Sequence, residues 1–187
     1  MLNHISIAVN DPKRVADILA ELWNGMVIPF PPAPGSYIVL ANDGKGSGVE
    51  VTPAGTVLVP GEGLPPEDDL DAATAAFEAK FVKSEFVPQY VATHLNISTE
   101  LGIDEIRAIG KREGWRTFVA NRDGGLFQLV EMWVEGNFML EIMTPEQTAR
   151  YREITSPAFI AKAFAGEIPG FVPPHVPAAQ NDLSLIG

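Results

Sequence analysis

The sequence contains no cysteine among its 187 residues and only three histidines. The absence of cysteine excludes disulfides, thiolate nucleophiles and cysteine-ligated metal sites. A transition-metal site could therefore be built only from histidine, aspartate and glutamate side chains. With three histidines in the chain, few such sites can be assembled.

Basic residues are also scarce, with 13 lysines and arginines against 24 acidic residues and a net charge of −11. Such a surface repels nucleic acid phosphates and anionic lipids, so we expect neither nucleic acid nor membrane as a partner. The sequence has no run of eighteen apolar residues and no basic segment followed by an apolar one near its first residue. We therefore expect a cytoplasmic protein. The length and the 46% of hydrophobic residues predict one folded domain or two small modules that share a core.

The first 55 residues show the pattern of one strand, one helix and three further strands. Alternation over Leu2–Val9 places Ile5, Ile7 and Val9 on one face and His4 on the other. Asp11 followed by Pro12 predicts the start of a helix that ends before Gly25. Three strand-like runs with turn residues between them follow at Met26–Phe30, Tyr37–Ala41 and Gly48–Thr52.

The same βαβββ order restarts near residue 90. A strand is predicted at Val91–Ser98, and a helical pattern then runs to Gly114. Three further strands are predicted at Trp115–Ala120, Phe127–Val134 and Asn137–Met143, with Asp123, Gly124 and Gly125 as a turn between the first two. The fold class predicted is α+β, with two βαβββ modules forming an open, barrel-like cleft.

One histidine and one glutamate recur at matching positions of the two modules. His4 and His94 lie on the two first strands, 90 residues apart, and Glu50 and Glu141 lie on the two last strands, 91 residues apart. Each glutamate is flanked by aliphatic residues shortly before a Thr-Pro pair. Because the match involves two of only three histidines, chance is a minor explanation.

The four side chains are predicted to lie opposite the aliphatic, helix-covered faces of their sheets, where they can converge. Imidazole nitrogens and carboxylate oxygens suit divalent ions such as Zn²⁺, Ni²⁺, Co²⁺ or Mn²⁺. An ion that accepts more than four ligands would keep positions open for a substrate. The alternative is structural, with two partly buried histidines and two glutamates on solvated strand faces.

Paired βαβββ modules with histidine on the first strand and glutamate on the last resemble the vicinal oxygen chelate superfamily, which includes glyoxalase I and methylmalonyl-CoA epimerase. The resemblance covers residues 1–55 and 89–146. It implies that His4, Glu50, His94 and Glu141 ligate one divalent metal ion, which binds vicinal oxygens of a small-molecule substrate and stabilises an enolate while a carboxylate moves a proton. It also implies that Glu141 is the main base, although the pseudo-symmetry allows Glu50 that role.

Three functions are compatible with the resemblance. Ring cleavage and thiol addition to epoxides on this scaffold use His-His-Glu sets, so the additional Glu50 favours isomerase or lyase chemistry. The second function is metal-free sequestration of a small molecule, as in bleomycin-resistance proteins, and the third is a structural or interaction role. The arginines and lysines are scattered in the sequence and indicate no basic pocket for glutathione or coenzyme A.

Two segments lie outside the modules. Residues 56–88 form a predicted inserted linker with a helix at Leu70–Phe81, serving as a packing element or as a lid. Residues 147–187 form a predicted tail with helices at Glu146–Ile154 and Pro157–Phe164 and a proline-rich end that carries His175. The acidic insertion and the apolar tail lead us to expect a homodimer.

Overall fold

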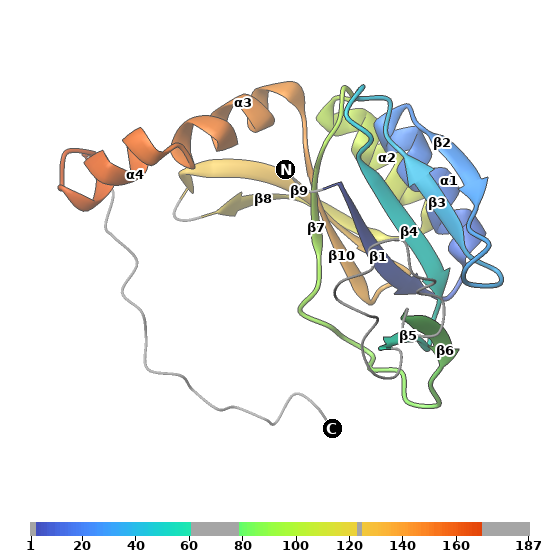
Figure 1. Cartoon of the computed structure of the whole chain (residues 1–187). Coiled ribbons are helices and arrows are strands. Elements are labelled where there is room, and N and C mark those ends of the chain that lie inside the picture. Colours follow the sequence, from blue (N-terminus) through green and yellow to red (C-terminus); the bar gives the residue numbers. More distant parts are fainter. Residues whose placement is uncertain (1–2, 61–78, 123–124, 170–187) are drawn as a thin grey trace, which may run out of the picture. The chain divides into compact units, whose positions relative to one another are not determined.

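The structure is a computed structural model of the chain, and it describes residues 3–60, 79–122 and 125–169 (Figure 1). The first module consists of β1 (His4–Val9), α1 (Pro12–Trp23), β2 (Met26–Pro29), β3 (Tyr37–Leu40) and β4 (Gly48–Pro53). The second consists of β7 (Leu95–Ser98), α2 (Ile103–Glu113), β8 (Arg116–Arg122), β9 (Phe127–Val134) and β10 (Phe138–Met143).

The two modules have the same sheet topology. The strand order is β1-β4-β3-β2 in the first sheet and β7-β10-β9-β8 in the second. In each sheet the first and last strands pair in parallel, and the other neighbours are antiparallel. Among the described strands no ladder joins the two sheets, which stay open. The predicted α+β fold with two βαβββ modules is confirmed.

Helix α1 begins and ends where the sequence predicts. The side chain of Asp11 accepts a hydrogen bond from the backbone N–H of Arg14, and proline occupies the first turn. Asn24 closes the helix in the left-handed conformation, with φ 48°. The next residue must be small, because a Cβ on Gly25 would lie 2.4 Å from the carbonyl oxygen of Leu40. This close approach lets the chain pass directly from α1 into β2, which pairs with β3.

A single hydrophobic core includes both modules. It contains the inward face of each helix and the helix-facing side chains of each sheet, among them Leu19, Val51, Ile106 and Ile142. Ion pairs join the two helices at its edge. On α1, Arg14 Nε donates to Glu113 Oε2 on α2 at 2.6 Å, and Arg112 Nη2 on α2 donates to Glu21 Oε2 on α1 at 2.6 Å. The modules are therefore packed through their helical sides.

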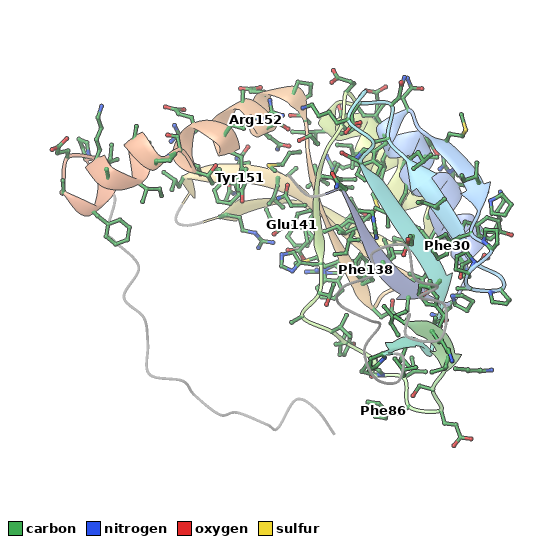
Figure 2. All side chains as sticks on the ribbon, in the orientation of Figure 1. Phe30, Phe86, Phe138, Glu141, Tyr151 and Arg152 are labelled. Atoms are coloured by element: carbon green, nitrogen blue, oxygen red, sulfur yellow. The ribbon has the colours of Figure 1, made fainter. Side chains whose placement is uncertain are left out.

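The insertion between the modules contains a small sheet that the sequence analysis missed. Strand β5 (Thr56–Val59) pairs antiparallel with β6 (Lys80–Lys83). The predicted helix Leu70–Phe81 is wrong at its end, because Lys80 and Phe81 belong to β6. Residues 70–78 of that predicted helix lie outside the described residues. Beyond β6, Phe86 is 76% exposed and points away from the sheets (Figure 2).

The predicted strand Val91–Ser98 is also too long. Strand β7 begins at Leu95, so His94 lies one residue before it, and Tyr90 and Val91 are exposed rather than paired in the sheet. Val91 has the same parity as Leu95 and Ile97 and so fits their alternation, but it lies outside the strand that pairs with β10. The sequence pattern therefore extends beyond the hydrogen-bonded ladder.

The chain divides into two compact units, with the boundary between Gln147 and Thr148, next to the predicted tail. In the second unit, the predicted helices are found as α3 (Pro145–Ile154), which begins before the boundary, and α4 (Pro157–Phe164). Ser156 caps α4 by accepting from the N–H of Phe159. His175 lies outside the described residues. None of the helices in the described part is both long and apolar enough to cross a membrane.

Candidate functional site

In the first module, parallel pairing of β1 with β4 brings His4 and Glu50 together. Ser6 is in register with Glu50, and His4 precedes Ser6 by two residues on the same face. The Nε2 atom of His4 lies 3.7 Å from Oε1 of Glu50. The hydroxyl of Ser6 donates a hydrogen bond to the other carboxylate oxygen, Oε2. The glutamate is nearly buried, whereas 58% of the histidine side chain is exposed.

The second module repeats this arrangement with different residues. Asn96 on β7 is in register with Glu141 on β10, and its Nδ2 donates to Glu141 Oε2 at 3.1 Å. The Nε2 atom of His94 lies 3.9 Å from the same oxygen. The Nδ1 atom of His94 lies 3.0 Å from the carbonyl oxygen of Ala92, which can fix the ring by a hydrogen bond. Glu141 is labelled in Figure 2.

Each histidine–glutamate pair fits half of a metal site. Two donors on one Zn²⁺ can be at most about 4.2 Å apart, since each bond is about 2.1 Å long. The separations of 3.7 and 3.9 Å lie within that limit. However, within the described parts of the chain no three histidine, aspartate or glutamate side chains are grouped to hold an ion. The structure brings His4 to Glu50 on one sheet and His94 to Glu141 on the other. The predicted grouping of all four side chains is not found among the described residues.

A charged cluster beside Glu141 was missed in the sequence analysis. Glu131 on β9 is the cross-strand partner of Glu141 and is only 6% exposed. Its carboxylate accepts hydrogen bonds from Trp133 Nε1 at 2.7 Å, Arg122 Nη2 at 2.7 Å and Arg116 Nη1 at 3.1 Å. The same Nη2 of Arg122 donates to Glu141 Oε1 at 3.1 Å. Two arginines that lie six residues apart on β8 thus meet at one carboxylate, a contact that the sequence did not indicate.

Hydrogen bonds and charge attraction outweigh burial in setting the pKa values of Glu131 and Arg122. Burial alone would raise the pKa of Glu131, but hydrogen bonds from Trp133 and Arg122, the attraction of Arg122 and the hydrogen bond from Arg116 lower it below its ordinary value. Burial likewise opposes the charge on Arg122, yet its hydrogen bonds to Glu131 and Glu141 raise its pKa. Both groups are charged in the folded chain at neutral pH.

A second carboxylate with a lowered pKa joins the modules. The pKa of Glu113 is lowered by hydrogen bonds from Arg112 and Arg14, and only 9% of its side chain is exposed. The folded chain therefore keeps Glu113 ionised to lower pH than the unfolded chain does. Its stabilising effect is present above the ordinary pKa of 4.5 and is lost as the pH falls through the folded value.

We expect Glu113→Gln to lower the free energy of unfolding at pH 7 by about 1–3 kcal/mol, because hydrogen bonds to a charged group are lost. The difference from the parent should narrow between pH 7 and pH 3, because the parent takes up a proton as the pH falls through the lowered folded pKa of Glu113. Urea unfolding at both pH values measures this. Glu153→Gln, which removes an exposed pair with Arg150, is the matched control. A difference that stays constant with pH would contradict the assignment.

The open faces of the two sheets differ in character. In the first sheet, the residue in register with Glu50 on β3 is Ile38, followed on β2 by Ile28. In the second sheet, the residue in register with Glu141 on β9 is Glu131, followed on β8 by Phe118. Cross-strand neighbours share a face of the sheet. One glutamate thus lies beside aliphatic side chains and the other beside a charged network.

Comparison with models of protein families and with curated protein sequences gives no match. Among solved structures, the chain is similar to the fosfomycin resistance protein FosX from Listeria monocytogenes, with a TM-score of 0.49, 13% identity, and coverage of 82% of this chain and 97% of that one. It is also similar to FosX from Mesorhizobium loti (TM-score 0.43, 14% identity, 81% and 97% covered). A third is a possible glyoxalase from Bacillus cereus (TM-score 0.42, 14% identity, 76% and 97% covered).

Proposed function

We propose that the chain is a metal-dependent enzyme of the glyoxalase-like type, an isomerase or lyase that moves a proton on a small oxygen-bearing substrate. The observation that carries this proposal is the duplicated histidine–glutamate pair. In both modules, glutamate on the last strand lies within 4 Å of histidine at the first strand, on the face opposite the hydrophobic core. A purely structural role would not require the same ionisable pair at both positions.

His4, Glu50, His94 and Glu141 would hold one divalent ion, either Zn²⁺, Ni²⁺, Co²⁺ or Mn²⁺. When bound, such an ion supplies Lewis acidity that makes a proton next to a carbonyl group easier to remove. Completing the set requires the two pairs to approach each other, within one chain or across the homodimer that we also propose. Light scattering at micromolar concentration measures the oligomeric state.

The carboxylates are the proton acceptors of the proposed reaction. Ser6 and Asn96 each hold one carboxylate from the neighbouring parallel strand, which orients it on the open face. We propose Glu141 as the principal base and Glu50 as its counterpart in the first module. The aliphatic surroundings of Glu50 would take the apolar part of a substrate and limit access of water.

A second candidate is metal-free sequestration of a small molecule. The observation that favours it is the hydrogen bond from Arg122 to Glu141, since a guanidinium already balances the carboxylate that the metal would need. In that case the open faces would bind a ligand without turning it over. We propose a small-molecule partner and a cytoplasmic location for either function.

Metal analysis tests the proposal. We expect protein purified without a histidine tag to contain, or to take up after dialysis, about one equivalent of divalent ion per chain. The analysis should be done after incubation with Ni²⁺, Zn²⁺, Co²⁺ and Mn²⁺ in turn. If the protein retains none of the four ions, the enzyme proposal is overturned and metal-free binding is favoured.

A further inference from the structure

One nitrogen of Arg122 is shared between two carboxylates. Its Nη2 atom donates to Glu131 Oε2 at 2.7 Å and to Glu141 Oε1 at 3.1 Å. Arg122 lies on β8, at the edge of the sheet order β7-β10-β9-β8, so its side chain reaches past β9 to a residue of β10. The shorter of the two hydrogen bonds is to Glu131.

Glu131 is the more firmly held of the two acceptors. It is buried, and Trp133 and Arg116 donate to its Oε1 in addition to the bond from Arg122 to its Oε2. Glu141 has Asn96 as its other side-chain donor and is more exposed. A buried carboxylate with three donors is an anchor for the guanidinium, because losing any donor would leave its charge poorly compensated.

The fold does not need this anchor. The first module has the same strand order, and the residue in register with its glutamate, Glu50, is Ile38 rather than a carboxylate. Replacing a buried ion pair with an apolar side chain of similar size is often neutral or stabilising. A buried glutamate at the equivalent position of the second module therefore calls for a role other than stability.

We infer that Glu131 is a positioning residue for Glu141 that acts through Arg122. Because Glu131 holds the guanidinium by the shorter hydrogen bond, Arg122 binds Oε1 of Glu141 less strongly. That oxygen therefore stays available to a cation or a proton. The assignment of Glu141 as a metal ligand rests on the proposed function. The sharing of Arg122 rests only on the hydrogen bonds described above.

The two singly substituted variants should change metal affinity in opposite directions. Arg122→Gln removes the competing guanidinium, so we expect Ni²⁺ to bind about three- to tenfold more tightly, measured by calorimetry. Glu131→Gln releases the guanidinium to Glu141, so we expect binding to weaken by a similar factor. The double variant should match Arg122→Gln, because Glu131 acts only through Arg122. Changes of the same sign, or additive effects in the double variant, would overturn the inference.

A metal-free measurement separates this inference from the proposed function. The indole N–H of Trp133 donates to Glu131, so its proton resonance reports on that carboxylate. We expect Glu141→Gln to shift this resonance in metal-free protein, although Glu141 is not a partner of Trp133, since Arg122 then binds Glu131 more fully. Glu50→Gln, the equivalent change in the first module, should leave the resonance unchanged. Trp133→Phe identifies the signal.

The outcomes are distinct. If the Trp133 resonance responds to Glu141→Gln and no divalent ion binds the parent protein, the proposed function fails and the positioning role of Glu131 stands. If the resonance does not respond to Glu141→Gln, the positioning role is wrong, whatever the metal analysis shows. If Glu131→Gln does not fold, as judged by circular dichroism, Arg122→Gln and Glu141→Gln still test the positioning role of Glu131.

Discussion

Replacing either His4 or His94 with alanine is expected to weaken divalent metal binding by about 100-fold or more. Each imidazole supplies a neutral nitrogen donor, and water replaces such a donor poorly. Mutation of a residue that only hydrogen-bonds to a metal ligand typically lowers metal affinity by about 10- to 100-fold. Loss of a ligand itself should lower the affinity by at least as much. Calorimetric titration with Ni²⁺ or Zn²⁺ on the metal-free protein measures the effect.

The third histidine provides the matched control for this result. His175→Ala removes an imidazole that belongs to neither pair and should leave the affinity unchanged. Affinity of the parent should also fall as the solution is acidified, because a histidine must be neutral to bind a metal. Equal metal affinity in the parent, His4→Ala and His94→Ala would show that the pairs do not ligate the ion.

Glu141→Gln is expected to retain most of the metal while turnover falls by about 100-fold or more. The amide oxygen of glutamine can still occupy a coordination position, but it cannot accept a proton. The variant therefore separates the ligand role of Glu141 from its role as base. The measurement compares kcat and bound metal in the parent and the variant, on a substrate that the parent converts.

Glu50→Gln is the comparison for this experiment, because Glu50 occupies the equivalent position in the first module. Its effect on turnover should be the milder of the two. A larger effect at Glu50 would transfer the role of base to the first module. Near-native turnover of Glu141→Gln with metal bound would refute the mechanism while leaving the metal site intact.

Local sequence signals predicted the elements of the modules well. The Asp11-Pro12 start of α1 and the turn residues between the strands act through nearby backbone, so they can be recognised without knowledge of the fold. Strand β9 has the predicted bounds, and the helical pattern that ends at Gly114 corresponds to α2. The repeat also indicated that each histidine and its glutamate occupy equivalent places in the two modules, while their contact within each module follows from the parallel pairing of first and last strands.

Contacts that depend on register across several strands could not be predicted. Arg116, Arg122 and Glu131 meet only because β8 and β9 pair in a particular register and because Arg122 reaches β10. The small β5–β6 sheet was missed for a related reason, since its partners are separated by a long segment. Whether the four candidate ligands come together depends on how the two sheets pack against each other. No local sequence pattern specifies that packing.

Each module is completed by contact between its two ends. The first strand pairs with the last, while the intervening strands pair with sequence neighbours in hairpins. Pairings of high sequence separation are the slow part of folding, so each histidine should meet its glutamate late. Because both modules share one core and a domain generally folds as a unit, we expect neither histidine–glutamate pair to be stable until β10, the last strand of the second module, has left the ribosome.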